Sequence, residues 1–196
     1  NSACNVLEAS LAPALPLDAP GEPVGLSNAQ MSTGLAGWVI WSMGDFVARH
    51  GQHDVPRALT CLHALTQRST AEFAIRPFIQ QQPDAVWPVL ARWANDPSAH
   101  VRRLVSEGSR PRLPWGLRLQ ALVADPMPTL PLLRALQDDP SSYVRRSVAN
   151  HLNDIAKDHP DLVAGWVKDH LIQATPERST LLRHASRSLI KQGHAP

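Results

Sequence analysis

The sequence lacks the marks of membrane and secreted proteins. No apolar run approaches the roughly 20 residues that span a bilayer, because the best candidate, residues 34–47, is interrupted by Gly and Asp. The chain starts without the basic residues and cleavage pattern of a signal peptide. Its two cysteines, Cys4 and Cys61, are far apart in sequence and show no pairing pattern. We therefore expect a cytoplasmic protein with no membrane contact.

Familiar enzyme motifs are missing as well. The sequence has no Gly-rich phosphate loop, no HExxH, no paired CxxC and no GxSxG. Its nine histidines are dispersed, and a single histidine on a helix is more often solvated or packed than a metal ligand. We therefore expect no metal and no cofactor, which leaves carboxylates as the candidates for catalysis.

Charge is scarce, and most of the positive charge is arginine. The net charge is only +2, from 19 basic and 17 acidic residues, so bulk charge does not by itself indicate nucleic acid. All but three of the basic residues are arginine, whose planar guanidinium suits phosphate. Between Asp96 and Trp115, four arginines stand against two acidic residues. This stretch is a local basic patch in a chain that is not basic overall.

The sequence does contain a repeat. DPSAHVRR begins at Asp96, and DPSSYVRR begins 43 residues later at Asp139. Helical patterns occur in pairs around these phrases: 56–66 with 69–81, 84–94 with 97–108, 129–137 with 140–157, and 160–173 with 177–191. Strand patterns are absent, and a period of 38 to 43 residues is typical of HEAT repeats. The sequence predicts an all-α, HEAT-like helical-repeat solenoid, in which Asp96 and Asp139 cap equivalent inner helices ahead of a proline.

The first part of the chain follows a different pattern. Residues 1–27 contain four prolines and no sustained period, which predicts an extended leader that its leucines hold against the domain. An apolar face from Ser27 to His50 predicts one more helix before the pairs. We therefore expect a leader over residues 1–27 and a repeat domain over 28–196.

Arginines recur on the predicted inner helices. They are Arg76, Arg102, Arg103, Arg145, Arg146 and Arg183. If these helices line a concave surface, the six cations form a basic channel that can follow a phosphate backbone, because packed helices are spaced about 10 Å apart. The alternative is that one arginine of each pair forms a salt bridge with the preceding aspartate of its own repeat.

A carboxylate shares one of these helices. Arg146, Asn150 and Asp154 are spaced by four residues and so lie on one helix face, with Asn153 beside them. This face could carry chemistry, or it could be a solvated surface with local hydrogen bonds.

Two further residues have open interpretations. Glu72 can complete a capping box with Ser69 or Thr70, or it can serve a site. Trp115 follows Arg-Pro-Arg in the proline-punctuated loop SRPRLPWG. It either plugs the groove between repeats or offers a surface to a ligand, and the neighbouring arginines favour the second.

The phrases HVRRLVSEGSRPRLPW, DDPSSYVRRSVANHLNDIAKDHP and STAEFAIRPF closely resemble the HEAT-like-repeat DNA alkylation repair glycosylases of the AlkC/AlkD superfamily, and are most similar to the AlkC branch. The resemblance covers about residues 28–192. It implies hydrolysis of the N-glycosidic bond of cationic N-alkylated bases, chiefly 3-methyladenine and, in this branch, 3-methylcytosine. It also implies action without a metal, and without burying a flipped base in a tight pocket. Some members carry an immunoglobulin-like C-terminal domain, for which this sequence leaves no room, so we expect its DNA contacts to be lacking.

The motifs also assign residues. The acidic residues of the family's site fall on Glu72 and Asp154, and its aromatic residue on Trp115. We assign DNA contacts to Arg76, His100, Arg102, Arg103, Arg110, Arg112, Tyr143, Arg145, Arg146, Asn150, Asn153, Lys157 and Arg183. The expected partner is double-stranded DNA containing alkylated bases, bound by a monomer. Two other hypotheses are a HEAT-type DNA-binding protein without catalysis and a protein-interaction scaffold.

Overall fold

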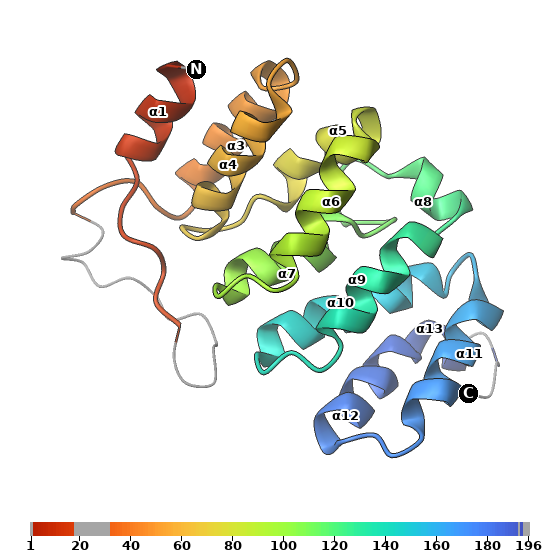
Figure 1. The fold of residues 1–196 in the computed structure, drawn as a ribbon. Coiled ribbons are helices and arrows are strands. Elements are labelled where there is room, and N and C mark those ends of the chain that lie inside the picture. The colour runs from red at the N-terminus through yellow and green to blue at the C-terminus, as the bar shows by residue number, and fades with distance from the viewer. Residues whose placement is uncertain (1, 18–31, 192, 194–196) are drawn as a thin grey trace.

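The computed structural model describes residues 2–17, 32–191 and 193, and these form helices in two layers (Figure 1). The inner layer consists of α3 (Val39–His50), α5 (Glu72–Gln81), α7 (Ala99–Gly108), α10 (Ser142–Ile155) and α12 (Pro176–Ala185). The outer layer consists of α4 (Val55–Thr66), α6 (Pro83–Trp93), α9 (Leu130–Leu136) and α11 (Pro160–Leu171). Each outer helix packs on the inner helix that follows it, so the predicted helix pairs are confirmed.

One hydrophobic core runs between the layers along the whole stack. It includes Leu62 of α4, Ile75 of α5, Leu104 of α7 and Leu152 of α10, all almost completely shielded from solvent. Burying one such side chain contributes roughly 1.5–3 kcal/mol, so neighbouring repeats stabilise one another through shared apolar contacts. Among the described helices, none is long and apolar enough to cross a membrane.

The repeated Asp-Pro phrase forms a turn before each inner helix. The predicted aspartate caps are wrong by two residues, because α7 and α10 follow the N-cap residues Ser98 and Ser141. Asp96 Oδ1 instead accepts a hydrogen bond from the backbone N–H of Ser98 at 2.8 Å, and Asp139 Oδ1 accepts one from Ser141 at 2.9 Å. A short acidic side chain that bonds two residues ahead stabilises a turn, and this turn directs the chain into the inner layer.

The N-terminal segment is not extended throughout. The expectation is wrong for α1 (Ser2–Ala9), which packs on α4 and places Glu8 Oε1 2.5 Å from the guanidinium of Arg57. Its apolar side chains gain burial against the core, as predicted for the leucines of this segment. Residues 18–27 lie outside the described part of the chain, as do residues 28–31 of the next predicted helix. Residues 32–38 are described and are not helical, so the prediction is wrong for them, and α3 begins at Val39.

The sequence also missed short elements. Helix α8 (Gln120–Ala124) and a 3-10 helix (Met127–Thr129) connect the second and third pairs. The single helix predicted for 177–191 is divided into α12 and α13 (Arg187–Lys191). At the division, the hydroxyl of Ser186 donates to the carbonyl of Leu182 at 2.8 Å, a local bond that competes with helix continuation.

Candidate functional site

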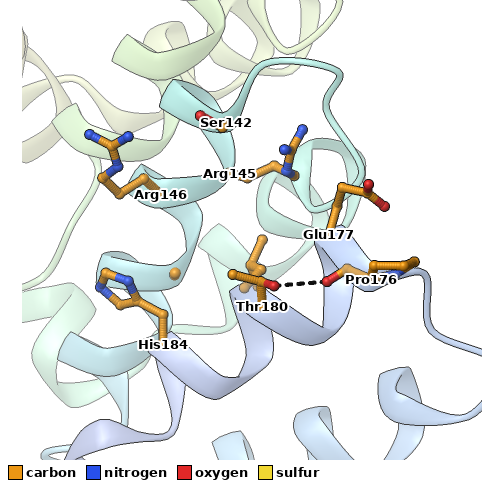
Figure 2. Close-up of a pocket in the computed structure, with 9 residues that line it drawn as sticks. Ser142, Arg145, Arg146, Pro176, Glu177, Thr180 and His184 are labelled. Carbon is orange, nitrogen blue, oxygen red and sulfur yellow. Dashed lines mark hydrogen bonds between the residues drawn. The ribbon is translucent and has the colours of Figure 1, made fainter.

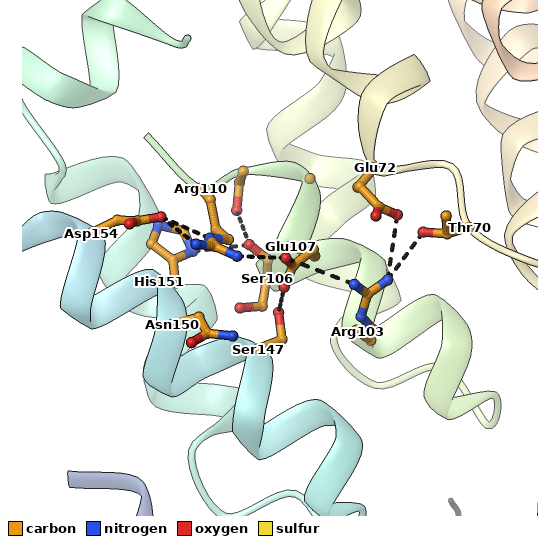
Figure 3. A network of polar contacts seen from close by, with 12 residues as sticks. Thr70, Glu72, Arg103, Ser106, Glu107, Arg110, Ser147, Asn150, His151 and Asp154 are labelled. Carbon is orange, nitrogen blue, oxygen red and sulfur yellow. Dashed lines mark hydrogen bonds and ion pairs between the residues drawn. The ribbon is translucent and has the colours of Figure 1, made fainter. Parts of the chain in front are cut away.

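Carboxylates and guanidinium groups alternate across three inner helices (Figure 3). Glu72 begins α5, Arg103 and Glu107 belong to α7, Arg110 follows α7, and Asp154 lies on α10. The guanidinium of Arg103 is 3.4 Å from Glu72 and 3.7 Å from Glu107. That of Arg110 is 2.6 Å from Glu107 and 2.7 Å from Asp154. We call these five residues the carboxylate network.

The carboxylates of this network are buried, at 7% exposure for Glu72, 6% for Glu107 and 2% for Asp154. A buried charge is costly unless it is paired and hydrogen-bonded. The hydroxyl of Ser147 donates to Glu107 at 2.6 Å, and Lys157 Nζ donates to the second oxygen of Asp154 at 2.8 Å. These bonds fix the orientation of both carboxylates.

The charge states within the network follow from its geometry. Burial opposes ionisation of Glu107, but Arg103 and Arg110 more than offset it, so the pKa of this carboxyl is lowered. Burial, followed by the charge of Arg110, lowers the pKa of His151 to about 3. The neutral imidazole donates from Nδ1 to the carbonyl of Ser106 at 2.9 Å. The site therefore combines an ionised Glu107 with a histidine that stays uncharged.

Two members of this region were not predicted from the sequence. Glu107 stands four residues after Arg103 and three before Arg110, a spacing that places all three side chains close together on one helix end. That signal was available in the sequence. Burial of His151 was not, because it depends on the packing of α7 against α10.

Glu72 does not cap its helix. The N-cap residue is Ala71, without a side-chain hydrogen bond, and Glu72 is the first helical residue. The capping box proposed with Ser69 or Thr70 is therefore wrong. The hydroxyl of Thr70 and the carboxylate of Glu72 both accept hydrogen bonds from Arg103 Nη1 instead, at 3.0 and 3.4 Å.

Trp115 projects from the loop after α7. Its side chain is 95% exposed and its backbone has a φ of 61°, a left-handed conformation that is rare for a bulky residue. An aromatic side chain of this size is normally packed. The alternative that it plugs the groove between repeats is therefore wrong, and the side chain is available to a ligand.

Arg76 supports this loop from inside and does not reach the surface. It is fully buried, and it donates to the carbonyls of Gly108 at 2.9 Å, Arg110 at 2.7 Å and Leu117 at 2.5 Å. Burial, together with the charge of Arg110, lowers its pKa to about 10. The expected DNA contact of Arg76 is wrong, because the side chain is buried. Its three hydrogen bonds hold the two ends of the loop.

The two arginines of each Val-Arg-Arg phrase have different positions. Arg102 and Arg145 each donate to the carbonyls of the preceding Asp-Pro, so the first arginine clamps the turn of its own repeat. Arg102 also forms a two-pronged ion pair with Asp139 of the next repeat, at 2.6 and 2.9 Å. The alternative of a salt bridge to the preceding aspartate of the same repeat is therefore wrong, because the bonds within the repeat go to carbonyl oxygens and the ion pair of Arg102 is with the aspartate of the next repeat. Among the described residues, the second arginines, Arg103 and Arg146, make no such bond to the turn of their own repeat.

A polar hollow lies between α10 and α12, apart from the carboxylate network (Figure 2). It has a volume of about 390 Å³, and its lining includes Arg145, Arg146 and His184. Arg146 is exposed and forms no ion pair with any described residue. The imidazole of His184 bonds to Oδ1 of Asn150 at 2.8 Å. Two guanidinium groups beside hydroxyl side chains suit an anion such as phosphate.

The other predicted contact residues are dispersed. Arg112 is paired with Asp158 at 2.6 Å, and Arg183 is exposed on α12. Asn153 accepts a bond from the backbone of Ser188, which ties α10 to α13. None of these three lies in the carboxylate network.

One predicted contact is excluded by burial. His100 is only 3% exposed and lies edge-on to Tyr143, so its assigned DNA contact is wrong in this conformation. The ring of Tyr143 receives the guanidinium of Arg103 at 5.1 Å. Tyr143 therefore helps position Arg103.

Comparison with known proteins decides which family this geometry belongs to. Residues 45–189 match the model of the family described as DNA alkylation repair enzyme. The chain belongs to this family. The chain is also 41% identical to the Pseudomonas fluorescens alkylpurine DNA glycosylase AlkC, solved bound to DNA containing an abasic site analog. That match has a TM-score of 0.78 and covers 87% of this chain and 50% of the other.

A second protein matches the chain at similar identity. The uncharacterized protein YhaZ of Bacillus subtilis (strain 168) is 45% identical over 149 residues, which are 76% of this chain and 42% of that protein. The chain thus spans half or less of the length of these relatives. Among the residues that the structure describes, no three or more His, Cys, Asp or Glu side chains are arranged to hold a metal ion.

Proposed function

We propose that this chain is a DNA glycosylase that removes cationic N-alkylated bases, 3-methyladenine and also 3-methylcytosine, by hydrolysing the N-glycosidic bond. The observation that carries the proposal is the buried carboxylate network (Figure 3), with the exposed Trp115 on the loop that follows Arg110, in a chain 41% identical to an alkylpurine DNA glycosylase. That relative is bound to DNA with an abasic site analog. An abasic site is the product that remains when a base has been excised.

The network is suited to this reaction because the substrate already carries the positive charge. A base alkylated on a ring nitrogen leaves as a neutral molecule, so no general acid is needed. The sugar that remains develops oxocarbenium character, and a carboxylate held nearby stabilises that charge and orients the attacking water. We assign this role to Glu72 and Asp154. Because Arg103 and Arg110 hold these groups in place before substrate arrives, little reorganisation is required.

Aromatic and basic side chains supply the remaining functions. Trp115 would contact the cationic base through its ring face, a contribution of roughly 0.5–2 kcal/mol. We assign phosphate contacts on double-stranded DNA to Arg146 and Arg183, which are exposed and without ion pairs among the described residues. The guanidinium of Arg145 and the α10–α12 hollow extend the same basic surface.

The test is chromatographic identification of the bases released from methylated DNA. The wild type should release 3-methyladenine and 3-methylcytosine, and we expect Asp154→Asn and Glu72→Gln each to slow release by about 10² or more. Asp138→Asn is the matched control, because it breaks an aspartate–arginine pair, with Arg178, outside the network. Its activity should equal that of the wild type.

Other outcomes would assign the chain differently. Full activity in the folded double variant Glu72→Gln, Asp154→Asn would contradict the assignment of the carboxylates. Salt-sensitive binding to DNA without release of any base would indicate a DNA-binding protein without catalysis. Absence of DNA affinity would indicate an interaction scaffold.

A further inference from the structure

The two cysteines meet in the structure, although they stand far apart in the sequence. Cys4 lies on α1 and Cys61 on α4, two helices that pack against each other (Figure 1). Cys61 is completely shielded from solvent, and Cys4 is half-buried against the same hydrophobic core. The proposed reaction uses neither residue.

Hydrogen bonds between α1 and α4 align the two cysteines. The guanidinium of Arg57 donates to Asn5 at 2.7 Å and to both carboxylate oxygens of Glu8, at 2.5 and 2.8 Å. Cys61 stands one turn after Arg57 on α4. Cys4 stands one turn before Glu8 on α1. Because residues four apart share one helix face, both cysteines lie on the faces that these bonds hold together.

The two thiols are also close enough to interact. Burial, followed by the charge of Cys4 and that of Glu8, raises the pKa of Cys61 to about 12, and a side-chain hydrogen bond with Cys4 adds to the shift. A hydrogen bond requires the two side chains to be direct neighbours. At neutral pH Cys61 is therefore a protonated thiol whose sulfur adjoins that of Cys4.

We propose that Cys4 and Cys61 form a reversible disulfide, which fastens α1 to α4 when the chain meets a small-molecule disulfide such as oxidised glutathione. A disulfide needs side chains that point toward each other from closely spaced backbones, and facing positions on packed helices provide this. The chain thus carries a redox-sensitive pair outside the carboxylate network. This proposal does not depend on the glycosylase function.

The disulfide forms by two successive exchanges. The thiolate of Cys4, the more exposed of the two, attacks one sulfur of the small disulfide. A mixed disulfide forms, and one small thiol leaves with the proton that Cys4 gave up. The thiolate of Cys61 then attacks the sulfur of Cys4, which closes the protein disulfide and releases the second small thiol with the proton of Cys61. Two protein thiols are oxidised, and one small disulfide is reduced to two thiols.

The fold favours the second exchange over other fates of the mixed disulfide. Because packing holds Cys61 against Cys4, this step is intramolecular and needs no second collision. The high pKa of Cys61 leaves little thiolate at neutral pH, so the step should be faster in mildly alkaline solution.

The disulfide would reinforce a weakly attached helix. No residue of α1 is fully buried, and elements with few buried contacts open locally at low free energy. A bond between residues 4 and 61 also closes a long loop in the unfolded chain, which destabilises the unfolded state. We therefore expect oxidation to raise the Tm by about 5–10 °C and to slow amide exchange in α1.

The experiment counts thiols, and the count is unambiguous because the chain has two cysteines. The folded chain is incubated with oxidised glutathione at mildly alkaline pH, free thiols are blocked with N-ethylmaleimide in denaturant, and the intact mass is measured. We expect a monomer that has lost the mass of two hydrogen atoms, carries neither glutathione nor maleimide, and regains both thiols with dithiothreitol. A persistent mixed disulfide, a disulfide-linked dimer or two free thiols would each overturn the proposal.

Single variants test the roles of the two thiols. Cys61→Ser should accumulate the mixed disulfide on Cys4, because no thiol is left to displace the glutathione. Cys4→Ser should keep its buried thiol free, so glutathione on Cys61 in this variant would contradict attack through Cys4. Neither variant should gain Tm on oxidation, and an equal gain in Cys61→Ser would show that the disulfide is not the cause.

Discussion

His151 illustrates how strongly single residues are set by their surroundings. Its imidazole is completely buried beside Arg110 and Arg76, and it is uncharged because a second positive charge there would be desolvated and repelled. The neutral ring donates to the carbonyl of Ser106 and adds no further positive charge beside Arg110, whose guanidinium is paired with the carboxylates. The residue therefore stabilises the network only while it remains unprotonated.

We predict a pH dependence of stability from this residue. The pKa of His151 is about 3 in the folded chain, against an ordinary value of 6.5. As pH falls below 6.5 the unfolded chain takes up a proton that the folded chain cannot, so the free energy of unfolding decreases, by about 2 kcal/mol at pH 5. Urea denaturation at pH 7 and pH 5 measures this loss.

The matched control for this prediction is another histidine. His151→Gln should lose most of the pH effect, while His53→Gln, at an exposed position, should retain it. Burial lowers the pKa of His100 and His184 as well, so a smaller slope should persist in His151→Gln. The same loss of stability in His151→Gln as in the wild type would contradict the explanation.

At the scale of elements, the loop between α7 and α8 is held by a buried arginine of α5 and by two ion pairs of its own. Arg76 of α5 binds carbonyls at both ends of this loop, and Arg110 and Arg112 within it pair with Asp154 and Asp158. The loop has little regular structure, yet three inner-layer contacts position it. This explains how an exposed tryptophan can be held in a defined place.

Replacing Arg76 should loosen the loop. Arg76→Met removes the donor from the buried bonds to the carbonyls of Gly108 and Arg110 and from the part-buried bond to that of Leu117, which we expect to cost about 3 kcal/mol or more. Amide exchange at residues 109–119 should accelerate more than exchange in α10. Arg118→Met, an exposed position in the same loop, is the control and should leave exchange unchanged. Equal protection of the loop in Arg76→Met and wild type would show that other contacts hold it.

The sequence predicted the paired helices to within about two residues in most cases, because apolar periodicity and the Asp-Pro phrases are local signals. It could not predict which group each arginine side chain binds. A guanidinium suits a carbonyl, a carboxylate and a phosphate alike, so Arg76, Arg102 and Arg146 look equivalent in sequence. Which partner each meets depends on helix packing. For the same reason α1 was missed, since its apolar face is short and is stabilised by α4.

At the scale of the whole molecule, the net charge is small because basic and acidic residues are nearly equal in number, and several of them are paired with one another. Arg102, Arg110 and Arg112 are all engaged with aspartate or glutamate. Only a minority of the predicted contact residues is therefore available to a polyanion. Although the net charge is only +2, a few exposed arginines without ion pairs among the described residues carry the positive charge that a polyanion can contact.

Salt dependence of DNA binding should separate the two kinds of arginine. Arg146→Ala and Arg183→Ala should each reduce the slope of log K against log salt by about 1, because each removes one phosphate contact. Arg102→Ala should leave the slope unchanged and lower the thermal stability, since it breaks the ion pair with Asp139. Fluorescence anisotropy with a labelled duplex at several salt concentrations measures the slope. An unchanged slope in both Arg146→Ala and Arg183→Ala would contradict their assignment.

The left-handed backbone at Trp115 lowers the stability of the folded chain at the residue that we assign to ligand contact. A residue with a β-carbon pays on the order of 1 kcal/mol to adopt this conformation, whereas glycine adopts it freely. Packing of the indole does not offset this cost, because the side chain is 95% exposed. Glycine at this position would give the more stable free chain, and only a large aromatic residue gives the proposed contact with the base. If Trp115 makes the proposed contact, binding of the base would offset the conformational cost at residue 115.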